Sequence, residues 1–144
     1  MAEDNYKILL FMKRRPGMTF EAFRDYYENQ HAPLCVKYAS GISRYVRRFL
    51  TPHPNPETGA SEELPFDVIT ELWFADEAIF RGTVEYLATS IMPDEVVEDE
   101  KRLFDRSKTR MATVVECESA LTEKNMSRDQ DAQPSSWAIQ CTKR

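Results

Sequence analysis

The chain has 144 residues, enough for one compact domain with a hydrophobic core. Hydrophobic residues make up 42% and charged residues 30%, a mixture typical of a folded globular protein. The formal net charge of -5 opposes binding to a phosphate backbone, and no apolar run reaches the roughly 18 residues needed to cross a bilayer. Nucleic acid and membrane partners are therefore not expected.

Cysteine usage and the start of the chain favour a cytoplasmic protein. Cys35, Cys117 and Cys141 are widely spaced and form no CxxC pair, so we expect reduced thiols and neither a disulfide framework nor a zinc site. The stretch from Met1 to Lys7 contains an acidic pair and lacks the basic and apolar regions of a secretory signal. Only four glycines occur, so no nucleotide-binding glycine loop can be written.

The first predicted element is a strand over residues Tyr6 to Lys13 (YKILLFMK), which ends before the turn signal Pro16 and Gly17. Apolar side chains alternate onto both faces of this strand. Neither face is then suited to contact with water, so we expect other layers of structure to cover both sides.

A helix is predicted after the first strand, with Thr19 as its N-cap and an end near Pro33. Phe23, Tyr27 and His31 follow one another at intervals of four residues, so their side chains share one side of this helix. The imidazole of His31 is therefore expected at the carboxyl end of the helix.

The remaining sequence predicts three more strands and two more helices. They are a strand from Gly41 to Leu50, a proline-rich loop from Thr51 to Pro65, a strand from Phe66 to Phe74, helices from Asp76 to Leu87 and from Pro93 to Phe104, and a strand from Thr109 to Glu118. The acidic run Asp94 to Glu100 is interpreted as a solvated part of the second of these helices. We expect one domain over residues 1–120 and a flexible tail over residues 121–144.

The element order βαββαβ predicts an α+β fold of the ferredoxin-like type, an antiparallel four-stranded sheet with both helices on one face. Because the helix-free face is also apolar, we expect a second copy of the chain to cover it in a two-fold homodimer. RNA-recognition modules share this strand order, but their glycine and aromatic signature is missing here.

Two segments carry a family likeness. The segment KRRPGMTFEAFRDYYENQHAPL, Lys13 to Leu34, resembles the opening of EthD-domain proteins of the dimeric α+β barrel superfamily, and FDVITELWF, Phe66 to Phe74, is similar to their third strand. The resemblance implies a homodimer with a pocket between each sheet and its own helices or inside the barrel. It further implies a function like that of superfamily members in polyketide and aromatic metabolism, which decarboxylate, dehydrate, cyclise or oxygenate their substrates without a bound cofactor.

His31 is the predicted catalytic residue, because imidazole can take and return a proton near neutral pH. Enolisation, dehydration or loss of carbon dioxide from a β-keto or phenolic substrate requires such a group. A structural histidine bonded at a helix end remains the alternative. The helix end favours imidazolium and an apolar pocket favours the neutral base, so the sequence leaves the protonation state open.

Other side chains are predicted to complete the site around His31. Tyr27 and Glu71 are the further catalytic candidates, as acid or substrate anchor and as the carboxylate that orients the imidazole. An arginine beside aromatic residues suits an anionic substrate. The alternatives are core packing for Tyr27, a polar network for Glu71 and a solvated position at the sheet edge for the arginine. The candidates for substrate binding are Phe23, Tyr45, Arg47, Asp67, Trp73 and Asp105.

Two further patterns are not expected to carry chemistry. His53 lies in the proline-rich loop, where no packed scaffold fixes its geometry. His31 and Cys35 have the spacing of two metal ligands, but Pro33 lies between them and no third ligand is nearby, so no metal is expected.

The expected function is that of a cofactor-independent lyase or cyclase acting on a small aromatic or polyketide-derived intermediate by acid and base catalysis. Two alternatives stay open. One is a cofactor-free oxygenase of anthrone-type substrates, in which a carbanion formed by the same base reacts with oxygen. The other is a non-catalytic accessory protein that binds such a compound.

Overall fold

The computed structural model describes residues 6–122 and 139–143 of the chain. The chain divides into two compact units, with the boundary between Thr113 and Val114. The predicted flexible tail, residues 121–144, lies outside the described residues except for 121–122 and 139–143. No helix in the described ranges is both long enough and apolar enough to span a membrane.

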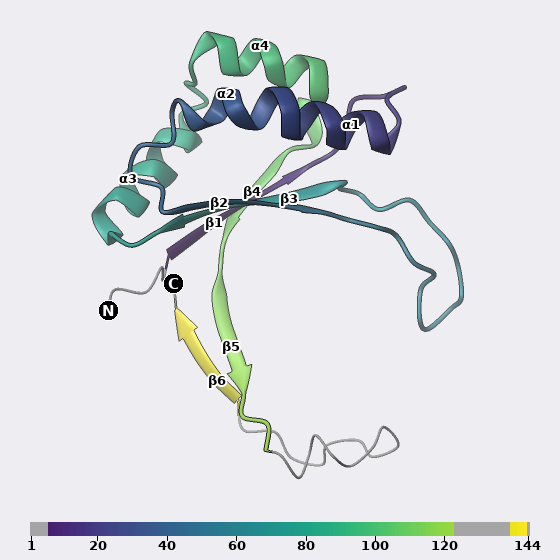
Figure 1. Cartoon of the computed structure of the whole chain (residues 1–144). Coiled ribbons are helices and arrows are strands. Elements are labelled where there is room, and N and C mark those ends of the chain that lie inside the picture. Colours follow the sequence, from purple (N-terminus) through teal and green to yellow (C-terminus); the bar gives the residue numbers. More distant parts are fainter. Residues whose placement is uncertain (1–5, 123–138, 144) are drawn as a thin grey trace. The chain divides into compact units, whose positions relative to one another are not determined.

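The first unit is built on a four-stranded antiparallel sheet, which confirms the predicted α+β class and ferredoxin-like order. The strands occur in the spatial order β2-β3-β1-β4. They are β1 (Tyr6–Met12), β2 (Arg44–Phe49), β3 (Val68–Phe74) and β4 (Arg110–Thr113). The helices cover one face of this sheet, and the long loop between β2 and β3 extends away from it (Figure 1). They are α1 (Phe20–Tyr26), α2 (Ala32–Val36), α3 (Glu77–Ala88) and α4 (Asp94–Leu103), with a 3-10 turn over Arg106–Lys108.

The first helical segment continues further than predicted, because a π-helical turn, Tyr27–His31, joins α1 to α2. Thr19 caps α1 as expected, since its side chain accepts a hydrogen bond from the Ala22 amide. Pro33 has no N–H with which to continue the α-helical ladder. The wider turn replaces that ladder locally with a bond from the Ala32 amide to the Tyr27 carbonyl, so the helix passes Pro33. This turn holds both Tyr27 and His31.

Side chains from the helices and from one face of the sheet form the core. Phe23 of α1 is fully buried with Val68 of β3 and Leu103 of α4. A second cluster joins Ile8, Leu72, Phe74 and Phe80. Asp76 caps α3 by accepting a hydrogen bond from the Ile79 amide, which fixes the start of the helix over this cluster.

The second unit contains the antiparallel strand pair β5 (Val115–Ser119) and β6 (Ile139–Lys143). The single strand predicted from Thr109 to Glu118 is therefore wrong in its extent. Its first part pairs with β1, its second part pairs with β6, and the β1–β4 register ends at Ile8 and Thr113.

The expectation of reduced thiols is wrong for Cys117, which is disulfide-bonded. Cys117 lies opposite Cys141 in the register of β5 and β6. Cys35 is a free thiol, as expected. Disulfides are rare in the cytosol, so the cysteines no longer support the predicted cytoplasmic location.

Candidate functional site

A cavity of about 600 Å³ lies between the sheet and helices α2, α3 and α4. This volume is within the range of small-molecule sites. Exposed side chains in its lining, Tyr38, Ile79 and Tyr86, mark its mouth. Its polar side chains that are not exposed come from the first helical segment, β2, β3, α3 and α4, and they are Tyr27, His31, Cys35, Tyr45, Thr70, Thr83 and Glu100.

His31 is held in one orientation by a carboxylate and by aromatic rings. Its Nδ1 lies 2.8 Å from Oδ2 of Asp99 on α4, and both residues are buried, with exposed fractions of 2% and 6%. The rings of Tyr27 and Phe104 pack edge to face against the imidazole at centroid distances of 5.3 and 5.4 Å. The imidazole therefore has little rotational freedom at the cavity wall.

Asp99 determines which nitrogen of His31 carries the proton. Burial raises the pKa of Asp99, but hydrogen bonds from Tyr26 and His31 outweigh burial and hold the pKa below its usual value. The Tyr26 hydroxyl donates to Oδ1 at 2.5 Å. The ionised carboxylate can only accept, so Nδ1 of His31 donates to it, and in the neutral imidazole Nε2 carries the lone pair.

Cys35 faces that lone pair. Its Sγ lies 3.4 Å from Nε2 of His31, one helical turn further along the chain, and the thiol lines the cavity. Burial raises the pKa of the Cys35 thiol to about 11. Toward a neutral imidazole, the protonated thiol is the donor and Nε2 is the acceptor.

The buried Tyr27 and the half-buried Tyr45 extend this polar end of the cavity toward β3. The Tyr27 hydroxyl lies 2.6 Å from Oγ1 of Thr70 and 3.4 Å from the Tyr45 hydroxyl. Burial raises the pKa of both tyrosines far above the ordinary value, so both remain O–H donors at neutral pH. Tyr27, Tyr45 and His31 are the predicted site residues that the structure brings together at the cavity.

Phe23 and Arg47 are not part of the cavity lining. Phe23 packs inside the core with no exposed surface. Arg47 forms two hydrogen bonds of 2.8 Å to the Glu28 carboxylate and lies over the Tyr45 ring. Because Glu28 already neutralises it, the predicted role of Arg47 in holding an anionic substrate finds no support in its position.

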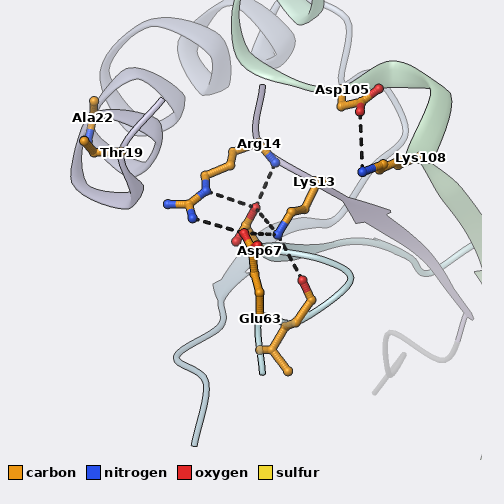
Figure 2. Close-up of polar contacts among 9 residues, drawn as sticks. Lys13, Arg14, Thr19, Ala22, Glu63, Asp67, Asp105 and Lys108 are labelled. Carbon is orange, nitrogen blue, oxygen red and sulfur yellow. Dashed lines mark hydrogen bonds and ion pairs between the residues drawn. The ribbon is translucent and has the colours of Figure 1, made fainter. Parts of the chain in front are cut away.

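Asp67 and Asp105 are also absent from the cavity lining. Asp67 directly precedes β3 and contacts the residues that follow β1, and Asp105 follows α4 (Figure 2). Asp67 accepts a hydrogen bond of 2.9 Å from the Arg14 amide and has the Lys13 ammonium at 3.5 Å. Asp105 accepts from the Ser107 hydroxyl at 2.6 Å and lies 3.9 Å from Nζ of Lys108. These contacts give both carboxylates structural partners.

Glu71 and Trp73 lie on the helix-free face, because they alternate along β3 with Thr70 and Leu72 of the cavity lining. Trp73 donates its indole N–H to Glu71 at 2.9 Å, and Arg48 donates to the same carboxylate at 2.7 Å. Asp99, and not Glu71, is the carboxylate that contacts His31.

Sequence reasoning missed Asp99 because it falls in the acidic run that was interpreted as solvated. A signal was present, since the buried positions of α4 are Val96, Asp99 and Leu103. These positions are three and four residues apart, so Asp99 lies on the apolar stripe of its helix.

Cys35 was considered only as a metal ligand. Within residues 6–122 and 139–143, no group of three or more histidine, cysteine and acidic residues is placed to hold a metal.

Comparison with known proteins identifies a family for most of the first unit. A family model described as the EthD domain matches residues 15–107, more than half of the chain. Among solved structures, the chain is similar to an ethyl tert-butyl ether D (EthD) family protein from Bacillus halodurans C-125. The identity is 19%, the match covers 75% of this chain and 97% of that chain, and the TM-score is 0.43. No curated protein matches the chain.

Proposed function

The chain belongs to the EthD domain family, and from this membership and the geometry of the cavity we propose that it is a cofactor-independent lyase. The proposed substrate is an aromatic or polyketide-derived intermediate, and the proposed reaction is dehydration, decarboxylation or cyclisation. One observation carries the proposal: the buried imidazole of His31, bonded to Asp99 at 2.8 Å through Nδ1, lines a cavity of about 600 Å³.

In the proposed mechanism, Nε2 of His31 takes a proton from the carbon next to a carbonyl group. The Tyr45 hydroxyl donates a hydrogen bond to the enolate oxygen that forms. In dehydration the imidazolium returns its proton to the departing hydroxide, so water leaves and a double bond remains. In decarboxylation, His31 takes the proton of the carboxylic acid and returns it to the carbon from which carbon dioxide departs.

The cavity lining supports an apolar, ring-shaped substrate with one anionic end. Apolar side chains of the sheet and helices contribute much of the lining, among them Leu10, Met12, Ile42, Leu72, Met92 and Val96. Lys37 is the only lysine or arginine among the lining residues, all of which belong to the described part of the chain, and it is exposed. A substrate carboxylate near Lys37 would leave the rings against the apolar wall.

The experiment that tests the proposal is an assay of purified protein with a panel of β-keto acids, hydroxylated tetralones and anthrones. Released carbon dioxide, absorbance changes of aromatisation and oxygen uptake are recorded for each compound. Substrate-dependent release of carbon dioxide or water without oxygen uptake is expected. Oxygen uptake would favour an oxygenase, and binding without any turnover would favour an accessory protein; either result contradicts the lyase.

We propose in addition that the chain forms a homodimer through the helix-free face of the sheet. Four apolar side chains gather there and are only half-buried within one chain, namely Leu9, Phe11, Val46 and Ile69. Lys7 lies over the Trp73 ring at one end of this group, while Glu71 lies within it, between Val46 and Leu9 in the register, and is neutralised by Arg48. Half-buried apolar side chains around a charge that is already paired suit coverage by a second copy of the chain.

Ile69→Asp is expected to convert the dimer to a monomer, because it places a charge at the centre of the proposed interface. Sedimentation should give twice the chain mass of 16.8 kDa for the wild type and the single mass for the variant. Lys101→Asp on the helical side is the matched control and should remain dimeric. A wild-type protein that sediments as a single chain would contradict the homodimer.

A further inference from the structure

We propose that Cys35 is a nucleophile of the cavity, which adds reversibly to electron-poor carbon–carbon double bonds such as those of quinones and α,β-unsaturated ketones. The proposal goes beyond lyase chemistry, since the addition requires no elimination and no loss of carbon dioxide. It gives a role to a half-buried thiol that the lyase mechanism does not use.

Cys35 and His31 of the first helical segment and Asp99 of α4 lie in a row, as a nucleophile, a base and the carboxylate that orients the base. Cys35 Sγ lies 3.4 Å from Nε2 of His31, and Nδ1 of the same ring lies 2.8 Å from the Asp99 carboxylate. This order of thiol, imidazole and carboxylate is the arrangement by which proteins activate a weak nucleophile. Both Cys35 and His31 line the cavity, so a bound molecule meets the thiol and its base together.

The charges around Cys35 do not favour a free thiolate. Asp99 and Glu100 of α4 oppose the negative charge, while Tyr45 and Arg47 of β2 favour it, and burial has the largest effect. The net result is the thiol pKa of about 11, so little thiolate exists at neutral pH. Reaction near pH 7 therefore requires His31 to remove the thiol proton as the carbon–sulfur bond forms.

The addition is balanced without any oxidant or reductant. The thiol proton passes to Nε2 of His31, and the sulfur bonds to the β-carbon of the acceptor. The π electron pair of the double bond moves to the carbonyl oxygen as an enolate, to which the Tyr45 hydroxyl can donate. The imidazolium then returns the proton to the α-carbon, and the reverse sequence releases the acceptor.

The pocket also suits the acceptor class. Quinones and cyclic enones are flat and apolar with a polar carbonyl edge. The apolar wall formed by Leu10, Met12 and Leu72 lies next to the hydroxyl groups of Tyr45 and Thr70 in the same cavity. A flat ring against the wall would direct its carbonyl group toward the hydroxyls and its double bond toward the thiol.

The test is alkylation by N-ethylmaleimide under non-reducing conditions, followed by mass spectrometry with peptide mapping. Wild-type Cys35 should be labelled at pH 7 more than tenfold faster than the same residue in His31→Asn. The His31→Asn rate should recover only as the pH rises toward the thiol pKa of about 11. Cys35→Ser should show no label on this peptide, and labelling in urea should be equal for wild type and His31→Asn.

If His31→Asn does not fold, the proposal is tested by the pH dependence of the Cys35 alkylation rate in the wild type alone. A rate that reaches its plateau well below pH 11 supports the proposal, and a rate that follows the thiol pKa overturns it. Equal rates in folded wild type and His31→Asn, or an unlabelled Cys35, also overturn it. Since the assay needs no turnover, its result is independent of the lyase assay.

Discussion

His31→Asn is expected to lower kcat by about 10² to 10⁴-fold on any substrate that the panel identifies, the range associated with a positioned acid or base. Asparagine cannot exchange a proton near neutral pH, yet its amide N–H can donate to Asp99 in place of Nδ1. The variant should therefore keep the buried carboxylate bonded and retain the fold. Steady-state kinetics with circular dichroism as the check of folding provide the measurement.

The matched control is His53→Asn, which replaces the other histidine of the chain. His53 is exposed in the long loop between β2 and β3, and it is absent from the cavity lining. The kcat of the His53→Asn variant should equal that of the wild type. A folded His31→Asn protein that retains more than about a tenth of wild-type turnover would show that His31 is not the base, since even the low end of the expected range exceeds that loss.

Asp99→Ala is expected to lower the free energy of unfolding by about 2 to 6 kcal/mol, because it leaves two donors without an acceptor and each such loss costs about 1 to 3 kcal/mol. The change leaves the Tyr26 hydroxyl and Nδ1 of His31 without their acceptor. Asp99→Asn keeps one acceptor oxygen and should cost less, about 1 to 3 kcal/mol. Urea titrations give both values, and both variants should also lose turnover, because His31 is no longer oriented.

Glu98→Ala is the control for Asp99, since it removes the neighbouring acid of the same helix. The Glu98 side chain is exposed and bonded to Lys101 one turn away, so no measurable loss of stability is expected. Asp99→Ala as stable as Glu98→Ala would contradict the structural role given to the buried carboxylate.

The stabilisation by Asp99 should depend on pH with a defined sign. The folded-state pKa of Asp99 is lower than its ordinary value, so its contribution is fully present above the unfolded pKa, about 3.9. It is lost as the pH falls through the lower folded value. The contribution of the Asp99 carboxylate to the stability difference between wild type and Asp99→Asn should therefore shrink as the pH falls below about 4.

Local patterns were enough to predict the sheet and its helices. Alternating apolar residues located β1 and β3, and the caps Thr19 and Asp76 located the starts of α1 and α3. The spacing of Tyr27 and His31 also placed them on one face of a helix. Pattern reasoning failed at Pro33, where a π-helical turn lets the helix continue and no local signal distinguishes it from a helix end.

Contacts between distant segments could not be predicted in the same way. The bond of His31 to Asp99 joins residues 68 positions apart, and the choice of Asp99 over Glu71 depends on which face of the sheet each carboxylate reaches. The change of partner between β4 and β5 has no turn residue to mark it, because the stretch from Thr109 to Glu118 is uniformly strand-compatible. Pairing partners are set by the rest of the fold.

Nitrogen NMR of protein labelled with ¹⁵N-histidine directly tests whether Asp99 holds His31 with a free Nε2 toward the cavity. With only two histidines, His31→Asn assigns the signals. At neutral pH we expect a protonated Nδ1 and an unprotonated Nε2 for His31, and a shift of this balance in Asp99→Asn. A protonated Nε2 with a bare Nδ1, or a tautomer unaffected by Asp99→Asn, would contradict it.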